Sequence, residues 1–328
     1  MIILVLSRSA FVSLLPNHRQ ALNKYMNLSS RSRVLIQGID SPQATEYALQ
    51  MKAYGTKIAA GISAGLGGET IAEIPVFDLV EDAIAAVGKV EATLIFVHPY
   101  QVLDAAKEAL AAKIPRIILL TNGVPPLDLI CLLQEAKKTD TLILGPGSSG
   151  IIIPEKISLG KLNPELYTSG KIGVISSSES LAYEVVLELN RVGLGQSFVV
   201  TIGNEPMIGS SFQQWLTILA TDTNTEGIVL IGQPDSSQLE VANYCRNAKL
   251  KKPVIAYLVG LNAPKEKIYR DATTIIANQL SYSVSTDNKD NDIINALKQA
   301  GVLIAKCPSE IPVLLSKTLS TEKLAQKN

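Results

Sequence analysis

The sequence predicts an α/β protein in which two doubly wound parallel sheets follow one another along the chain. The chain has 328 residues, and at roughly 150 residues per domain this length indicates about two domains. Hydrophobic residues make up 47% of the chain and charged residues 18%, a composition typical of buried cores and not of disorder. Short β-rich apolar runs alternate with segments of helical period in both halves, which is the pattern of parallel βαβ units.

The first half is expected to hold one doubly wound sheet. Each expected strand is a short run rich in Val, Ile and Leu, and each expected helix has apolar residues three or four positions apart. Asp40 or Ser41 is placed to cap the first helix, with Pro42 at its first position. The expected strands are 33–38, 57–61, 93–97, 116–120 and 141–145. The expected helices are 43–54, 80–87, 102–112 and 127–138.

A passage rich in Gly, Pro and Ser, from Gly145 to Gly170, is predicted to join the two domains. The alternation then restarts, with expected strands at 171–176, 198–202, 227–232, 253–258 and 302–305. The expected helices are 179–192, 212–220, 237–247, 292–300 and 310–319. The polar segment 281–291 is expected to be an exposed loop. We divide the chain into an N-terminal extension (1–27), a first domain (28–150) and a second domain (151–328).

Composition excludes several classes of function. Thirty Lys and Arg balance thirty Asp and Glu, so there is no basic field for nucleic acid or an anionic membrane. No apolar run approaches the roughly 18–20 residues of a membrane helix. Two His and three scattered Cys, without ligand spacing, indicate no metal site and a reducing cytoplasm. Residues 1–25 are interpreted as a non-essential extension, with Met26 as an alternative start.

Two loops in the first half are candidate binding sites. In the turn from Gln37 to Ala44, a strand, a Gly-containing turn and a helix N-terminus meet as they do in phosphate sites, although capping alone also explains these residues. This first strand-to-helix turn lacks the G-x-G-x-x-G pattern, which argues against a nicotinamide-dependent dehydrogenase. The glycine-rich loop 61–68 is either a tight turn or a place of close backbone approach. His98 is expected to be a ligand-edge or cap residue and not a catalyst.

The second half offers a further strand-to-helix turn at 176–180. Its helix N-terminus could hold an anion, but Glu179 lies in the first turn, where the helix dipole stabilises a carboxylate without any ligand. A capping role is therefore favoured. Trp215 falls in a helical apolar pattern and is expected in the core. Taken alone, the run 265–271 is typical of a charged surface loop.

Short segments in a fixed order carry a resemblance to a known family. They are Ala53-Tyr-Gly-Thr-Lys57, Gly65-Leu-Gly-Gly68, Ile74-Pro-Val-Phe77, Gly123-Val-Pro125, Tyr183-Glu184, Gly193-Leu-Gly-Gln-Ser197, Ile208-Gly-Ser-Ser-Phe212, Lys252-Pro-Val254 and Ala263-Pro-Lys265. Together they resemble the α subunit of succinyl-CoA synthetase (succinate–CoA ligase), from about Leu28 to Leu319. The resemblance implies a Rossmann-like CoA-binding domain followed by a flavodoxin-like ligase domain. It also implies a partner β subunit with an ATP-grasp fold.

The resemblance implies a CoA site built from three loops. The family's Gly-Phe-Thr-Gly-Ser-Gln-Gly turn reads Gly38-Ile-Asp-Ser-Pro-Gln-Ala44 here, and the backbone N–H groups of Gln43 and Ala44 are expected to be available to a phosphate. The family's lysine in the glycine-rich loop is Leu66, which removes a phosphate contact and weakens the expected binding of CoA. The expected CoA-binding residues are Gly38, Asp40, Ser41, Pro42, Gln43, Leu66, Val97, His98 and Pro99.

In the ligase domain the resemblance implies that the family's catalytic residues are replaced. The family phosphorylates a histidine in the stretch Gly-His-Ala-Gly-Ala-Ile-Ile, which reads Arg270-Asp-Ala-Thr-Thr-Ile-Ile276 here, so Asp271 stands at the histidine position. Gln233 stands at the glutamate that orients this histidine, and the family's Ser-Arg-Ser-Gly reads Ser176-Ser-Ser-Glu179. Tyr183, in the shared Tyr-Glu pair, is expected to contact substrate.

Three functions follow from this comparison. The first is an α-subunit-like CoA-binding protein without phosphohistidine-dependent ligase activity, which acts as a binding or regulatory subunit beside a β-like ATP-grasp chain. The second is a working α subunit of a nucleoside-diphosphate-forming succinate or acyl-CoA ligase. It would use Asp271 or a rearranged site, since an aspartate can carry a phosphoryl group as an acyl phosphate. The third is a purely structural partner whose glycine-rich loops are relics.

Overall fold

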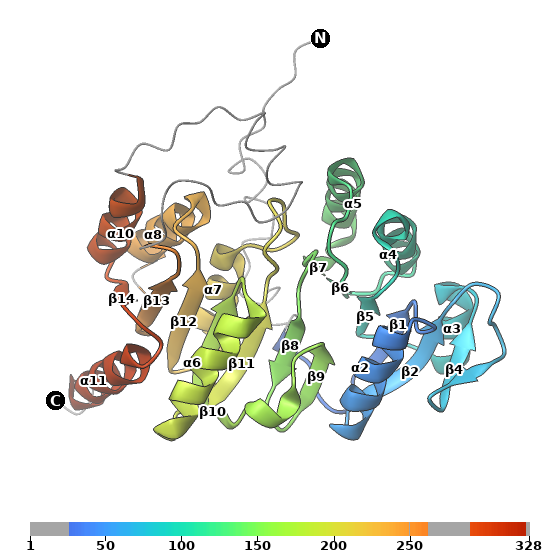
Figure 1. Cartoon of the computed structure of the whole chain (residues 1–328), viewed down its shortest axis with the longest axis horizontal. Coiled ribbons are helices and arrows are strands. Elements are labelled where there is room, and N and C mark those ends of the chain that lie inside the picture. Colours follow the sequence, from blue (N-terminus) through green and yellow to red (C-terminus); the bar gives the residue numbers. More distant parts are fainter. Residues whose placement is uncertain (1–25, 249, 262–288, 326–328) are drawn as a thin grey trace, which may run out of the picture.

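The computed structural model describes residues 26–248, 250–261 and 289–325. Within these residues the chain forms two seven-stranded sheets that lie side by side, with helices packed on them (Figure 1). The predicted fold class, two parallel-rich α/β units in tandem, is confirmed. The expected extension at 1–25 and the candidate Asp271 lie outside the described residues.

The first sheet has the strand order β3-β4-β2-β1-β5-β6-β7, and its described strands are parallel apart from the β3–β4 pair. The chain builds outward from β1 first through β2 and then through β5, so the topological switch point lies between β1 and β5. The strands are β1 (Arg33–Gln37), β2 (Lys57–Ile62), β3 (Thr70–Ile71), β4 (Ile74–Phe77), β5 (Ala92–Ile95), β6 (Arg116–Leu119) and β7 (Leu142–Leu144). The helices are α2 (Pro42–Ala53), α3 (Val80–Val87), the 3-10 turn η2 (Pro99–Gln101), α4 (Val102–Ala111) and α5 (Pro126–Thr139).

The second sheet has the order β14-β13-β12-β10-β11-β8-β9, parallel from β14 to β11 and antiparallel at the β8–β9 edge. Its switch point lies between β10 and β12, because β11 follows β10 on one side and β12 pairs with β10 on the other. The strands are β8 (Gly150–Ile153), β9 (Ile157–Gly160), β10 (Ser169–Ser176), β11 (Gln196–Thr201), β12 (Gly227–Gly232), β13 (Val254–Leu258) and β14 (Leu303–Ala305). The helices are the 3-10 turn η3 (Pro164–Leu166), α6 (Glu179–Arg191), α7 (Phe212–Thr221), α8 (Ser236–Ala248), α10 (Lys289–Gln299) and α11 (Glu310–Ala325).

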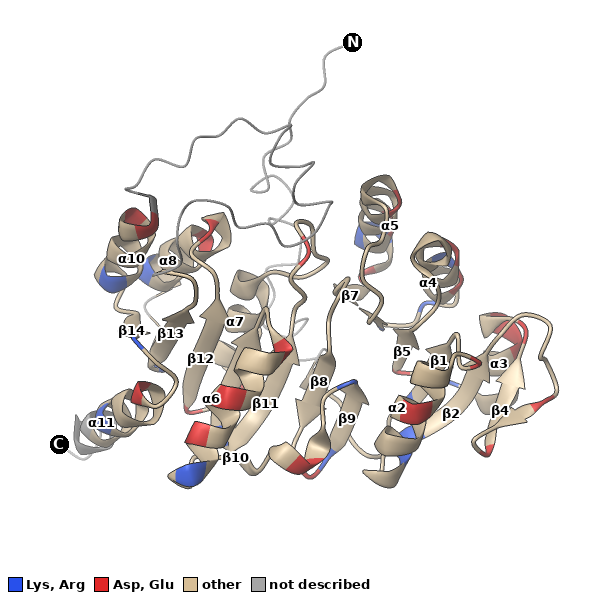
Figure 2. Ribbon diagram, in the orientation of Figure 1, with Lys and Arg blue, Asp and Glu red and all other residues tan. Residues whose placement is uncertain are grey.

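Burial on both faces explains why the central strands read as continuous apolar runs. The three middle residues of β1, Val34, Leu35 and Ile36, are fully buried, as is all of β12. Charged residues lie mainly on the helices, in the turns and at the strand ends (Figure 2). No helix in the described part of the chain is long and apolar enough to cross a membrane.

The structure adds detail to one sequence expectation and corrects another. The Gly/Pro-rich passage predicted as a domain junction contains the hairpin β8–β9, which pairs with β11 and completes the second sheet. The expected loop 281–291 ends in helix, because Lys289–Asn291 form the start of α10. The edge strands β3 and β4 were not expected either, since a strand of two residues and one interrupted by a proline leave little periodicity in a sequence.

Hydrogen bonds from the β8–β9 hairpin join the two sheets. Thr56 Oγ1 donates to Ser158 O at 2.7 Å and accepts from Ser158 N at 3.2 Å, and both residues are buried. The hydroxyl of Tyr54 accepts from the backbone N–H of Glu155 at 2.7 Å. The hairpin therefore belongs to the second sheet by strand pairing and contacts the end of α2 through side chains.

Replacing Thr56 with valine is expected to destabilise the protein by about 2 kcal/mol. Valine has about the same volume as threonine, but it cannot bond the buried backbone N–H and C=O of Ser158, which both lose their partner. The free energy of unfolding in urea measures this loss. Thr70→Val is the matched control, since Thr70 is exposed on β3 and the change there is expected to stay within about 0.5 kcal/mol. Equal losses in the two variants would contradict the role assigned to Thr56.

Candidate functional site

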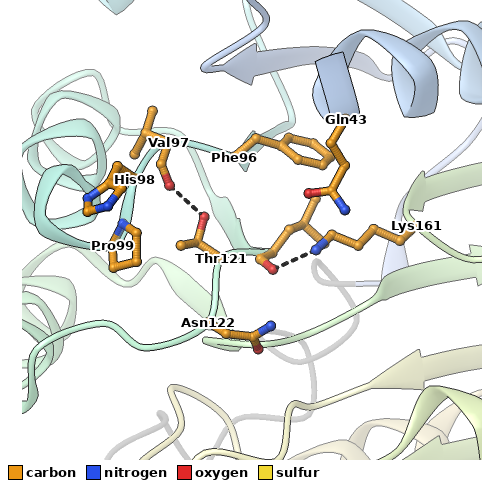
Figure 3. Close-up of a pocket in the computed structure, with 9 residues that line it drawn as sticks. Gln43, Phe96, Val97, His98, Pro99, Thr121, Asn122 and Lys161 are labelled. Atoms are coloured by element: carbon orange, nitrogen blue, oxygen red, sulfur yellow. Dashed lines mark hydrogen bonds between the residues drawn. The ribbon is translucent and has the colours of Figure 1, made fainter. Parts of the chain in front are cut away.

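A pocket of about 300 Å³ lies at the switch point of the first sheet (Figure 3). Loops that follow β1, β5 and β6 supply most of its wall, which is where doubly wound folds bind ligands. One further residue, Lys161, comes from the chain just after β9 in the second sheet. The lining residues are Gln43, Phe96, Val97, His98, Pro99, Leu120, Thr121, Asn122 and Lys161.

The β1–α2 turn places Gln43 at the pocket. Ser41, not Asp40, is the N-cap of α2, and its hydroxyl accepts from the backbone N–H of Ala44 at 3.2 Å. The expectation that the Ala44 N–H is available to a phosphate was therefore wrong, because the cap already uses it. Gly38 has a φ of +80°, and a Cβ there would lie 3.0 Å from the side chain of Val97, so glycine permits this close approach.

The loop after β5 lines the pocket with Phe96 to Pro99. The carbonyl of Val97 accepts from Thr121 Oγ1 at 2.8 Å, which ties this loop to the one after β6 (Figure 3). His98 stacks on the exposed ring of Tyr100, with centroids 5.5 Å apart, and Phe96 stacks on Tyr47 with centroids 6.2 Å apart. The expected position of His98 at the pocket edge agrees with this arrangement.

The glycine-rich loop after β2 donates two backbone hydrogen bonds to the carboxylate of Asp78. Asp78 Oδ1 accepts from the backbone N–H groups of Gly65 at 2.7 Å and Gly67 at 3.0 Å. Two N–H groups that a phosphate could use are thus bonded to the protein itself. Leu66 is half-buried and packs against the hydrophobic core, and it is not among the residues that line the pocket.

Lys161 supplies a cation to the pocket. Its Nζ donates to Leu120 O at 3.0 Å and lies 5.9 Å from the centroid of the Phe96 ring (Figure 3). Burial lowers the pKa of this ammonium, while the carboxylate of Glu179 acts in the opposite direction. Sequence reasoning missed Lys161, and with it Phe96, Leu120, Thr121 and Asn122.

At the switch point of the second sheet, the turn after β10 carries Glu179 at the start of α6. Glu179 Oε1 accepts from the hydroxyl of Tyr183 at 2.7 Å, and Oε2 accepts from the hydroxyl of Ser149. Burial, and then the bond to this carboxylate, raise the pKa of Tyr183 well above its usual range. The N-cap of α6 is Ser178, whose side chain makes no capping bond. Glu179 lies in the first turn of the helix, as expected, and its carboxylate is also bonded to two side chains.

The structure brings together only some of the residues expected from the sequence. Gln43, Val97, His98 and Pro99 line one pocket, whereas the lining does not include Gly38, Asp40, Ser41, Pro42 or Leu66. Tyr183, on α6, and Gln233, directly after β12, belong to the second domain and are not among the residues that line this pocket. Among the described residues no cluster of three His, Cys, Asp or Glu could hold a metal ion.

Family comparisons divide the chain in the same way as the two sheets. The family described as "CoA binding domain" matches residues 29–123, which make up most of the first sheet and its pocket. The family described as "Succinyl-CoA ligase like flavodoxin domain" matches residues 169–312. Residues 29–123 are accordingly a CoA-binding domain, and CoA is the cofactor of this chain.

Similar proteins are α subunits of acid–CoA ligases. The Archaeoglobus fulgidus protein named succinate–CoA ligase [ADP-forming] subunit alpha 2 is 34% identical over 293 residues, which cover 89% of this chain and 99% of that protein. The Methylorubrum extorquens malate–CoA ligase subunit alpha is 35% identical over 254 residues, covering 76% of this chain and 86% of that protein.

Among solved structures, ATP citrate lyase from Methanothrix soehngenii, in complex with citrate and coenzyme A, has a TM-score of 0.76 at 16% identity over 91% of this chain. A dinucleotide-forming acetyl-coenzyme A synthetase from Ca. Korarchaeum cryptofilum has a TM-score of 0.65 at 18% identity over 84% of this chain. These structures share the fold, and this chain spans 52% and 58% of their chains. Fold, sequence families and full-length relatives agree: the chain belongs to the family of succinate–CoA ligase α subunits.

Proposed function

We propose that this chain is a CoA-binding subunit that pairs with a β-like chain of ATP-grasp fold and acts without phosphohistidine-dependent ligase activity, as a binding or regulatory subunit. The pocket at the first switch point supports CoA or acyl-CoA as its ligand, and the relatives carry the word "subunit" in their names. Three free cysteines support a reducing cytoplasm as its location.

The observation that supports the loss of phosphohistidine chemistry is the position of the histidines. The chain has two histidines, His18 and His98, and neither lies between residues 169 and 312, the part that matches the ligase domain. A phosphohistidine cannot form in that domain without a histidine. Glu179 adds to this argument, because its carboxylate lies at the second switch point and like charges a few Å apart repel one another.

The rival function is a working α subunit in which Asp271 carries the phosphoryl group. Its support is a sequence match that extends through both domains. An acyl phosphate on Asp271 would be cleaved by hydroxylamine, and Asp271→Asn would abolish it. This outcome separates the rival from the proposal.

The test uses the full chain with and without its candidate β chain. We expect saturating CoA to stabilise the protein by roughly 3 kcal/mol at a hundredfold excess over Kd, seen as a rise in melting temperature. Incubation with ATP labelled in the γ-phosphate is expected to leave this chain unlabelled. No thermal shift with CoA would refute the binding role, and a hydroxylamine-sensitive label that disappears in Asp271→Asn would establish the rival.

A further inference from the structure

Lys161 belongs to the second sheet by sequence and to the first-sheet pocket by position. It follows Gly160, the last residue of β9, and its side chain extends to the loop after β6, where Nζ bonds the carbonyl of Leu120 (Figure 3). The Phe96 ring, 5.9 Å away, offers the ammonium a second neutral contact. The ammonium is thus held at the pocket wall by groups that carry no charge.

The nearby carboxylate does not pair with Lys161. Glu179 is close enough to influence the lysine, but its two oxygens accept from Ser149 and Tyr183. Within the described residues no carboxylate lies at salt-bridge distance from Lys161 Nζ, and no other Lys or Arg lines the pocket. A half-buried ammonium with one carbonyl partner keeps N–H donors for an anion.

We propose that Lys161 is the anion-binding residue of this pocket, and that its ammonium contacts an anionic oxygen of the bound CoA or CoA ester. The inference rests on the proposed CoA-binding function and adds the residue that binds the negative charge of the ligand. The amides of Gln43 and Asn122 line the same pocket and can donate to the same anion. Anionic oxygens occur in the phosphates of CoA and in an acyl group that carries a free carboxylate.

The experiment measures the Kd of CoA by calorimetry for the full chain and two variants. Lys161→Met keeps the alkyl stem and removes the charge, and we expect it to weaken binding by roughly tenfold to a hundredfold, the range for one charge-assisted hydrogen bond. Lys156→Met is the matched control, because Lys156 is exposed in the turn of the same hairpin. Its Kd is expected to equal that of the unchanged protein.

The choice of ligand identifies the anion. If a phosphate is bound, Lys161→Met weakens CoA, acetyl-CoA and succinyl-CoA alike and leaves pantetheine unaffected. If the acyl carboxylate is bound, the loss appears with succinyl-CoA and not with acetyl-CoA. Equal affinities of Lys161→Met and the unchanged protein for every ligand would overturn the proposal while CoA binding stands. Failure of the unchanged protein to bind any CoA compound would overturn both.

A second measurement needs no variant, and it tests whether Lys161 contacts bound CoA even if Lys161→Met does not fold. Lysines of the unchanged protein are reductively methylated with and without saturating CoA, and the modified sites are located by mass spectrometry. We expect CoA to reduce methylation at Lys161 at least several-fold and to leave Lys156 unchanged. Equal methylation of Lys161 in both samples would contradict a direct contact.

Discussion

Gly150→Ala is expected to destabilise the protein by roughly 3–5 kcal/mol, through steric overlap and backbone strain together. Gly150 begins β8 with a φ of +107°, and a Cβ there would lie 1.8 Å from the carbonyl oxygen of Leu159. The obstacle is backbone of the paired strand β9, so no rotamer change can relieve it. Because Gly150 pairs with Gly160, directly before Lys161, we also expect weaker CoA binding.

Urea unfolding measures this effect, with the fluorescence of Trp215, the single tryptophan of the chain, as the signal. Gly193→Ala is the matched control. Gly193 also has a positive φ, +75°, but a Cβ there would meet nothing within 4 Å, so only about 1 kcal/mol of backbone strain is expected. If Gly150→Ala loses no more stability than the control, the overlap with Leu159 is not what requires glycine at position 150.

The same glycine shows why the sequence did not reveal the β8–β9 hairpin. Gly150 and Gly160 read as loop residues, yet each gives room for the backbone of the opposite strand: a Cβ on Gly160 would lie 2.3 Å from Ser149 O. A glycine needed for packing and a glycine needed for a turn look the same in one sequence. The elements with regular apolar periodicity gave a stronger signal, and α3 was predicted at its observed bounds, Val80–Val87.

Some residues of the candidate site could be predicted from the sequence and others could not. Gln43, Val97, His98 and Pro99 were expected from the family resemblance. Their loops also follow strands of a parallel sheet, which end at one edge, where a ligand binds. Lys161 could not be predicted, because its place in the pocket depends on two long-range facts. One is the antiparallel pairing of β8 with β11, and the other is the contact of the hairpin with Thr56 at the end of α2.

Trp215→Ala is expected to cost about 3–5 kcal/mol, the usual range for an aromatic residue removed from a core. Trp215 lies on α7, is fully buried, and stacks on Phe198 with ring centroids 5.6 Å apart. Its Nε1 donates to Ser210 Oγ at 3.0 Å, so alanine leaves both a cavity and a buried hydroxyl that has lost its partner. Urea unfolding followed by circular dichroism measures the loss, since the variant has no tryptophan.

Trp215→Phe separates the cavity from the hydrogen bond. It retains a ring against Phe198 and removes the donor to Ser210, so we expect a loss of about 1–2 kcal/mol. A loss equal to that of alanine would mean that the hydrogen bond and not the volume dominates. Because Trp215 does not line the first-sheet pocket, saturating CoA should stabilise Trp215→Ala as much as the unchanged protein. A smaller stabilisation would show that packing under α7 helps to hold the first-sheet pocket in shape. The bond from Gly209 N to Gly145 O at 2.7 Å joins the loop before α7 to the end of β7 in the first sheet.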